Sequence, residues 1–126
     1  MLDTAADAEI RAVAEGYCRA LHTADADALE ALCHDGFFMT TVQPDGAQHV
    51  FDKERFVSRA RARSPFDGEP SYEILAIDVE APEMAHVKLW VDMPPRRFHD
   101  FLGFLRIGGE WTLVTKLFRT ASGPSI

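Results

Sequence analysis

The sequence predicts an α+β fold in which three N-terminal helices pack on a curved, mostly antiparallel sheet. Apolar residues recur with helical spacing in the first half of the chain, whereas everything after Ser71 reads as strands. Helices first and strands afterwards, without alternation, are typical of α+β proteins with antiparallel sheets. The 126 residues, 47% of them hydrophobic, correspond to a single domain over residues 1–126, because no stretch resembles a linker.

Two helices are predicted before the first strand. The first begins at Thr4, which is able to cap it, and runs to about Thr23. Its apolar face consists of Ile10, Val13, Ala14, Tyr17 and Leu21. Asp25 caps a second, short helix that ends at Asp35–Gly36. The inward residues of this second helix are Leu29, Leu32 and Cys33.

A small hairpin and a third helix follow. The strand Phe37–Val42 leads into the turn Pro44–Gly46, where proline and glycine each supply a preset dihedral angle. His49–Phe51 completes the hairpin. Asp52 caps the third helix, which ends at Ser64–Pro65 because the residue before proline resists helical geometry.

Four strands make up the remainder of the chain. They are Tyr72–Ala81, Met84–Met93, Arg97–Ile107 and Glu110–Thr120. Gly108–Gly109 separates the last two, and a two-residue type I′ turn needs positive φ at both central positions. The sequence therefore predicts a tight hairpin at the double glycine.

Pairing across that turn sorts the last two strands into two faces. It places Phe101 opposite Lys116, and in the same register His99 lies opposite Phe118. One face then carries His99, Phe101, Gly103, Leu105, Thr112, Val114, Lys116 and Phe118. The other carries Phe98, Asp100, Leu102, Phe104, Trp111, Leu113, Thr115 and Leu117. A one-residue change of register would invert this assignment.

Both faces of this ribbon are largely apolar. An antiparallel sheet with one hydrated face alternates more cleanly between apolar and polar residues. Helices cover only one side of such a sheet, so the second face needs another cover. We expect a homodimer that forms through the outer face of the sheet.

Charge and cysteine content disfavour several classes of function. Thirteen basic against twenty acidic residues give a net charge of -7, which argues against nucleic acid as a partner. No apolar run approaches the ~20 residues needed to span a membrane, and Met1–Thr4 lacks the features of a signal peptide. Cys18 and Cys33 fit neither a disulfide framework nor a zinc site, so we expect a cytoplasmic protein.

Neither a metal nor a cofactor is expected. The scattered histidines lack the spacing of metal ligands: His22, His34, His49 and His86. Gly108–Gly109 has no phosphate-loop context, and no nucleophile motif is present.

Two segments resemble a known superfamily. The stretch Tyr17–Leu32, followed by Cys33-His34-Asp35, is similar to the opening of NTF2-like proteins, which include SnoaL-like and ketosteroid-isomerase-like members. The segment Phe98-His99-Asp100-Phe101, with Gly109–Phe118 after it, resembles the branch called putative lumazine-binding. The resemblance implies a cone-shaped domain that encloses a small-molecule pocket between its helices and the concave face of its sheet.

The same resemblance allows isomerase chemistry to be compared residue by residue. Ketosteroid isomerases use a tyrosine on the first helix, an aspartate base on the first strand and a protonated aspartate deeper in the sheet. Counted without gaps, Tyr17 matches the tyrosine, Thr41 stands in place of the base, and Gly103 lies near the second acid. A threonine hydroxyl cannot abstract a proton at neutral pH, so this chemistry is disfavoured.

Four side chains are candidates for polar or catalytic groups: Tyr17, His99, Asp100 and Lys116. Tyr17 either donates into the pocket or is a core residue whose hydroxyl a neighbour satisfies. Lys116 either anchors an anionic or carbonyl ligand or pairs with Asp100 or His99. Asp100 serves in a salt bridge across the dimer or in acid–base chemistry, and His99 is predicted to share the Lys116 face.

The predicted ligand-binding set combines these groups with apolar walls that could equally be plain core. Its members are Tyr17, Met39, Thr41, Phe56, Trp90, His99, Phe101, Lys116 and Phe118. Arg55, Arg59 and Arg63 recur at every fourth residue; this basic stripe could bind an anion, but we expect a solvated helix face.

The function expected from these features is the binding of a small, partly apolar molecule. A first alternative is a cofactor-independent lyase, isomerase or hydrolase of a small metabolite, in which the four polar candidates supply an acid–base pair. A second alternative is a structural dimer without a ligand.

Overall fold

A computed structural model describes residues 4–126 of the chain. The helices are α1 (Thr4–Thr23), α2 (Ala26–Leu32) and α3 (Lys53–Arg61). The strands are β1 (Cys33–Val42), β2 (Gln48–Asp52), β3 (Tyr72–Glu80), β4 (Met84–Met93), β5 (Arg96–Ile107) and β6 (Glu110–Ser122). The predicted order of elements is confirmed. Thr4 is already helical instead of preceding the helix, and the signal-peptide expectation rests on residues 1–3, which lie outside the described part.

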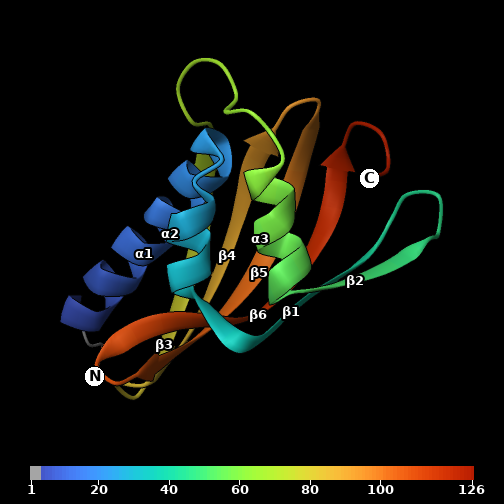
Figure 1. Cartoon of the computed structure of the whole chain (residues 1–126). Helices are drawn as coiled ribbons and strands as arrows, with labels where there is room; N and C mark the ends of the chain where they lie inside the picture. Colours follow the sequence, from blue (N-terminus) through green and yellow to red (C-terminus); the bar gives the residue numbers. More distant parts are fainter. Residues whose placement is uncertain (1–3) are drawn as a thin grey trace.

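The strands form a single curved sheet with the order β2-β1-β6-β5-β4-β3. All neighbouring pairs are antiparallel except β1 and β6, which run parallel. The three helices lie on one side of this sheet, with α1 packed on β3 and β4 and α3 packed on β1 and β2 (Figure 1). The α+β fold with a mostly antiparallel sheet is therefore confirmed, and the opposite face of the sheet carries no helix.

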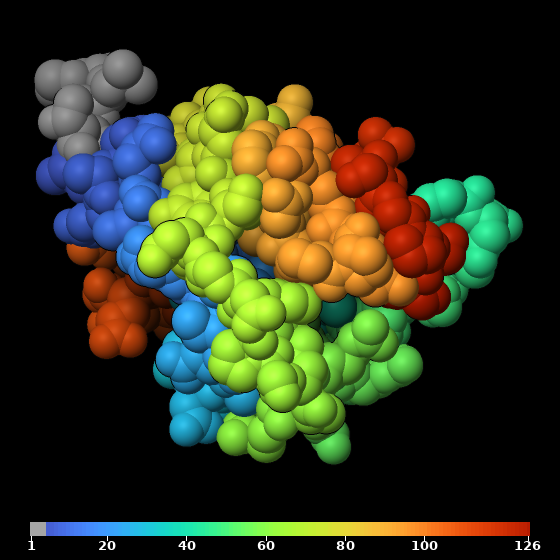
Figure 2. Space-filling view, turned by 90° about the horizontal axis from the view of Figure 1, so that it is seen from above, coloured from blue at the N-terminus to red at the C-terminus, as the bar shows by residue number. Residues whose placement is uncertain are grey.

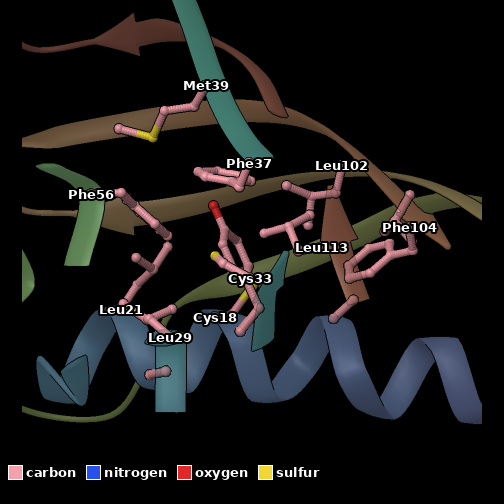
Figure 3. Close-up of a cluster of buried hydrophobic side chains, with 14 of the residues drawn as sticks. Cys18, Leu21, Leu29, Cys33, Phe37, Met39, Phe56, Leu102, Phe104 and Leu113 are labelled. Atoms are coloured by element: carbon pink, nitrogen blue, oxygen red, sulfur yellow. The ribbon is translucent and has the colours of Figure 1, made fainter. Parts of the chain in front are cut away.

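The core lies between α1 and the sheet. Helical spacing brings the predicted face of α1 inward, where Ile10, Ala14, Tyr17, Cys18 and Leu21 are almost fully buried. Side chains from α1 and from the strands meet in this layer, as the labelled residues show (Figure 3). Burial of this apolar stripe is what fixes the helix on the sheet.

The second helix is capped as expected but ends earlier than predicted. The Asp25 carboxylate accepts a hydrogen bond from the amide of Ala28 at 3.1 Å. The prediction of an end at Asp35–Gly36 is wrong, because Cys33 is already extended and pairs with Leu113 of β6. Burial of Cys33 in the core holds the backbone in the sheet at this point.

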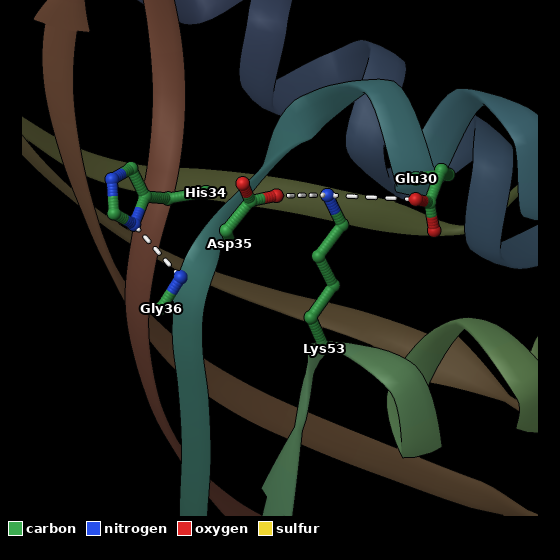
Figure 4. A network of polar contacts seen from close by, with 5 residues as sticks. All are labelled: Glu30, His34, Asp35, Gly36 and Lys53. Atoms are coloured by element: carbon green, nitrogen blue, oxygen red, sulfur yellow. Dashed lines mark hydrogen bonds and ion pairs between the residues drawn. The ribbon is translucent and has the colours of Figure 1, made fainter.

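Ion pairs of Lys53 join the start of α3 to the junction between α2 and β1. The Lys53 ammonium lies 3.2 Å from the Asp35 carboxylate and 3.6 Å from the Glu30 carboxylate (Figure 4). In the same segment the ring of His34 accepts a hydrogen bond from the amide of Gly36 at 2.9 Å (Figure 4). These contacts link the chain on either side of the first hairpin.

The third helix begins as predicted and ends one turn early. The Asp52 carboxylate caps it by accepting a hydrogen bond from the amide of Arg55 at 2.9 Å. The last helical residue is Arg61, well before Ser64–Pro65. The chain then turns so that Arg63 points back towards α1, where it donates to the Leu21 carbonyl oxygen.

The β5–β6 hairpin has the predicted turn, with φ of +59° at Gly108 and +83° at Gly109. Ile107 pairs with Glu110, and this register holds as far as Phe104 and Leu113. Val114 is then an extra residue on β6, so that Gly103 pairs with Thr115. The glycine allows a close approach, since a Cβ atom there would lie 3.2 Å from the Thr115 methyl group.

This bulge overturns the predicted face assignment beyond Gly103. Phe101 lies opposite Leu117, and His99 lies opposite Arg119, instead of Lys116 and Phe118. The inner face of the hairpin consists of Phe98, Asp100, Leu102, Phe104, Trp111, Leu113, Lys116, Phe118 and Thr120. Lys116 therefore shares a face with Asp100, and the prediction that it shares one with His99 is wrong.

None of the helices within residues 4–126 has the length and apolar character required to cross a bilayer.

Candidate ligand-binding cavity

A cavity of about 360 Å³ lies between α3, the end of α1 and the inner face of the sheet. Its lining residues are Leu21, Met39, Phe56, Arg59, Ala60, Ala62, Arg63, Phe66, Met93, Pro94, Arg96, Phe98, Lys116, Phe118 and Ile126. In the view from above, the surface is hollowed between the green atoms of α3 and the orange atoms of the β4–β5 connection (Figure 2). The volume falls within the about 300–1,000 Å³ range of small-molecule pockets.

Four of the predicted ligand-binding residues line this cavity: Met39, Phe56, Lys116 and Phe118. The ring of Phe118 packs edge-on against Phe98, with 5.7 Å between the ring centroids. Sequence reasoning missed Phe98, because it was assigned to the opposite face from Phe118. It also missed the contributions of Phe66 and Ile126, which come from segments without a periodic pattern.

Lys116 belongs to a buried polar cluster behind the inner wall. Its ammonium lies 3.7 Å from Asp100, and the two side chains are 6% and 0% exposed. The Tyr17 hydroxyl donates to the same Asp100 oxygen at 2.7 Å. Of the two interpretations of Lys116, the structure supports a structural pair with Asp100, which lies in the interior and not on the outer face.

Aromatic rings surround the Lys116 ammonium as well. It lies 4.9 Å from the ring centroid of Phe118, 5.0 Å from that of Phe56 and 5.4 Å from that of Tyr17. These rings and the Asp100 carboxylate compensate the burial of a cation that is otherwise costly. Lys116 is the member of the cluster that reaches the cavity wall.

Tyr17 is held in its protonated form. Burial, reinforced by the charge of Asp100, raises the pKa of Tyr17 well above its usual value of 10.0. Its proton lies in the hydrogen bond to Asp100, so the hydroxyl is satisfied by a neighbour and does not line the cavity. The second oxygen of Asp100, Oδ1, is buried without a hydrogen-bond partner.

The structure changes one correspondence with the isomerases, namely the position of the second acid. The ungapped count placed the second acid near Gly103, whereas the structure places Asp100 against Tyr17. Thr41, in place of the base, is buried outside the cavity and accepts a hydrogen bond from the side chain of Gln43 at 3.1 Å. A tyrosine and an acid are therefore neighbours, but Tyr17 donates to Asp100, whereas the two residues of the isomerases form an oxyanion hole. Thr41 still stands in place of the base.

Three predicted ligand-binding residues lie on the outer face of the sheet and are excluded from the cavity. His99 and Phe101 border a separate outer hollow together with Lys88, Leu117 and Arg119. Trp90, which pairs with His99 in the sheet, is covered by the Arg97 guanidinium at 3.8 Å from its ring centroid. For His99 and Phe101 the reason is the bulge at Val114, because beyond it they pair with Arg119 and Leu117 instead of Phe118 and Lys116.

The basic stripe also differs from expectation. Arg59 and Arg63 line the cavity, although we expected a solvated helix face. Arg63 is half-buried, and its Nη1 atom is buried without a hydrogen-bond partner. Arg96, from the β4–β5 connection, lines the cavity as well.

Neither cysteine is suited to nucleophilic chemistry. Burial is the main cause that raises the pKa of Cys33 to about 12 and the pKa of Cys18 further still. Both thiols are free and buried in the core. Within residues 4–126, no group of three or more His, Cys, Asp or Glu side chains is placed to hold a metal ion.

Several solved structures share the fold. An NTF2-like protein of unknown function from Silicibacter pomeroyi has a TM-score of 0.86 and 23% identity, over 95% of this chain and 99% of that chain. Another, from Shewanella baltica, has a TM-score of 0.86 and 19% identity, over 98% and 99% of the two chains. A ketosteroid isomerase-like protein from Erwinia carotovora atroseptica has a TM-score of 0.73 and 19% identity, over 92% and 96%.

The sequence comparisons identify the family. Among the curated proteins, none matches this chain. The family model described as "Putative lumazine-binding" matches residues 5–119, which is most of the chain. The resemblance carried by the motifs that begin at Tyr17 and Phe98 is confirmed. This chain therefore belongs to the putative lumazine-binding family, and it shares the fold of NTF2-like proteins.

Proposed function

We propose that the protein binds a small, partly apolar molecule in this cavity without transforming it. The observation that carries the proposal is an apolar cavity of suitable volume that has one cation, Lys116, in its inner wall. The family description supports a small-molecule ligand in general terms. The other two members of the Lys116 cluster, Tyr17 and Asp100, are directed at each other instead of into the cavity.

A cofactor-independent lyase, isomerase or hydrolase is the second candidate. Tyr17, Asp100 and Lys116 form one cluster, and the unpartnered Oδ1 of Asp100 could accept a proton or a hydrogen bond. Against catalysis stands the placement of the cluster, because Lys116 is its only member among the residues that line the cavity. The position of an isomerase base is occupied by Thr41, which lies elsewhere.

Blocking the mouth of the cavity tests the binding proposal. Ala62 is exposed and lines the mouth, so Ala62→Trp is expected to fill the entrance with an indole. We expect the affinity for the neutral probe N-phenyl-naphthylamine, measured by fluorescence titration, to fall at least about tenfold, equivalent to about 1.4 kcal/mol. Folding stability should change by less than about 0.5 kcal/mol, as for other surface substitutions.

The matched control is Ala31→Trp, which places the same indole on an exposed site of α2 away from the cavity. This variant should bind the probe as the wild type does. Equal binding by all three proteins would locate the probe elsewhere and contradict the proposal. If none of them binds, a structural dimer without a ligand becomes the better description.

We propose further that two copies associate through the outer face of the sheet. Exposed apolar side chains are concentrated there: Phe38, Val42, Val50, Met84, Phe101, Leu105 and Leu117. Helices cover the inner face alone, so these side chains stay in contact with water in a monomer (Figure 1). Contiguous apolar surface of this kind marks an interaction site in a water-soluble domain.

Sedimentation velocity at micromolar concentration tests the dimer. Leu117 is 56% exposed near the middle of the outer face, and Leu117→Asp is expected to convert a dimer into a monomer because two carboxylates would be buried across the interface. Ala8→Asp adds the same charge to an exposed site on α1 and should leave the dimer intact. A wild-type protein that sediments as a monomer would refute this proposal.

The proposal includes a single-domain protein in the cytoplasm. Support for that location comes from Cys18 and Cys33, which are both free thiols in the core. A small metabolite would reach a cavity of this kind directly from the cytosol.

A further inference from the structure

We propose that the ligand is an anion, with an apolar body inside the cavity and a carboxylate, sulfonate or phosphate group held at the mouth by Arg63. This inference rests on the proposed function, because it specifies the class of molecule that the same cavity takes. It is carried by the distribution of charge around the cavity and by an unpaired donor at its edge.

All charged side chains that line the cavity are cations. They are Arg59, Arg63, Arg96 and Lys116, and no Asp or Glu is among the lining residues of the described chain. The positive charge of the cavity lining contrasts with the net charge of the whole chain, which is -7. A concave site lined by one sign of charge attracts ligands of the other sign.

Several cations outside the cavity are paired with carboxylates, although Arg11, Arg55, Lys88 and Arg119 form no ion pair within the described residues. Arg61 lies 3.2 Å from Asp27, and Arg97 lies 2.7 Å from Asp92. Lys116, inside the cavity, is neutralised by Asp100. Within residues 4–126 the three cavity arginines have no carboxylate oxygen within 4.0 Å, the limit for a salt bridge. Their charge is therefore available to a ligand.

Arg63 is the arginine with an unmet hydrogen-bonding need. Its guanidinium lies 4.8 Å from the ring centroid of Phe66, and its Nη2 atom donates to the Leu21 carbonyl oxygen. Its Nη1 atom is buried without a partner. Burial also lowers the pKa of Arg63 below its usual value, as expected for a cation withdrawn from water without a counterion. An anionic oxygen beside Nη1 would supply both the acceptor and the counterion.

The other two arginines strengthen the field but have other contacts. Arg96 donates from Nε to the carbonyl oxygen of Pro124 at 2.7 Å and from Nη2 to that of Ser125 at 2.9 Å. Arg59 lies over the ring of Phe51, at 5.1 Å from its centroid. Arg63 is therefore the residue that we expect to bind the anionic group directly.

The residues at the inner end of the cavity determine how the ligand is oriented. Its inner wall is aromatic and aliphatic, with Met39, Phe56 and Phe118 around the neutralised Lys116. An apolar body is stabilised there by burial, whereas a second anionic group would find no unpaired cation. The ligand class is thus an aromatic or alicyclic anion with its charged end outward.

Two fluorescent probes that differ by one charged sulfonate group test this inference. Anilinonaphthalene sulfonate is the anionic counterpart of N-phenyl-naphthylamine, and both fluoresce on entering an apolar site. We expect wild-type protein to bind the sulfonate at least about tenfold more tightly than the neutral probe, since a charge-assisted hydrogen bond is gained. Arg63→Gln should remove that preference, so that the variant binds the two probes with similar affinity.

Two further variants complete the experiment. Arg61→Gln removes a neighbouring arginine that is paired with Asp27 outside the cavity, and it should keep the preference for the sulfonate. Arg63→Lys retains the charge without the planar fork and should restore part of the preference. Melting curves of each variant confirm that the comparison is made on folded protein.

The outcomes separate this inference from the proposed function. Suppose that both probes bind with equal affinity, that Ala62→Trp excludes them and that Arg63→Gln does not affect them. The proposed binding cavity is then supported, and the anionic ligand class is overturned. If Ala62→Trp excludes neither probe, the proposed function itself fails. An equal loss of sulfonate binding in Arg61→Gln and Arg63→Gln would assign the preference to overall charge and overturn the role of Arg63.

Discussion

Replacing Asp100 by leucine is expected to lower the free energy of unfolding by about 3 kcal/mol. The substitution leaves the Lys116 ammonium buried without a counterion and the Tyr17 hydroxyl without its acceptor. Removing one member of a buried ion pair is strongly destabilising for this reason, whereas replacing both members by apolar residues is often close to neutral. Urea denaturation followed by circular dichroism measures the loss.

A double-mutant cycle isolates the interaction between the two charges. Lys116→Met alone should cost about 2 kcal/mol, less than Asp100→Leu, because the carboxylate that remains still accepts the hydrogen bond of the Tyr17 hydroxyl. The double variant should be no less stable than Asp100→Leu by itself. Additive losses would show that the pair contributes nothing as a pair.

The surface pair of Asp92 and Arg97 provides the matched control. These side chains lie 2.7 Å apart but are partly exposed to solvent. Asp92→Ala should therefore cost less than about 1 kcal/mol. A loss for Asp92→Ala as large as that for Asp100→Leu would remove burial as the explanation.

The second large effect is expected at Leu102. Leu102 is fully buried on the inner face of β5, whereas its neighbour Phe101 is 43% exposed on the outer face. Leu102→Asp would bury a carboxylate with no cation provided for it, at a cost comparable with the whole stability of a small domain, about 5–15 kcal/mol. We expect this variant to be unfolded in one-dimensional proton NMR spectra.

Phe101→Asp is the matched control and should remain folded, with dispersed amide signals. Leu102→Ala provides a variant that still folds, with an expected loss of about 3 kcal/mol in urea denaturation. The register without a bulge would place Phe101 on the Lys116 face and leave Leu102 on the outside. An unfolded Phe101→Asp beside a folded Leu102→Asp would therefore support that register and contradict the structure.

Part of the candidate site could be predicted from the alternation of residues within single strands. Alternation within one strand correctly placed Lys116 and Phe118 on the same face, and both line the cavity. The predicted pairing between the strands was wrong, so His99 and Phe101 were assigned to the pocket in place of Phe98, and Lys116 was separated from Asp100. An isolated glycine within a strand is a signal for a bulge, and Gly103 could have revealed it. The signal does not say which residue of β6 is the extra one.

The sequence offered Arg63 only as one member of a basic stripe that could bind an anion, and it did not set Arg63 apart from Arg55 and Arg59. Its spacing with Arg55 and Arg59 fits a solvated helix face, which is how such a stripe is ordinarily explained. The helix ends at Arg61, so the helical pattern no longer applies to Arg63. The turn after the helix brings Arg63 against Leu21 of α1 and against Phe66, and its Nη1 is buried there without a partner.

The sequence by itself determined the features that depend on neighbouring residues. These are the caps at Asp25 and Asp52, the turn at Gly108–Gly109 and the order of helices and strands. Each follows from local dihedral preferences or from a short apolar period. Tertiary structure alone decided the bulge at Val114, the meeting of Tyr17 with Asp100 and the isolation of Arg63 from any carboxylate. These features depend on segments far apart in the chain, whose packing and electrostatic energies are not set until the sheet and helices come together.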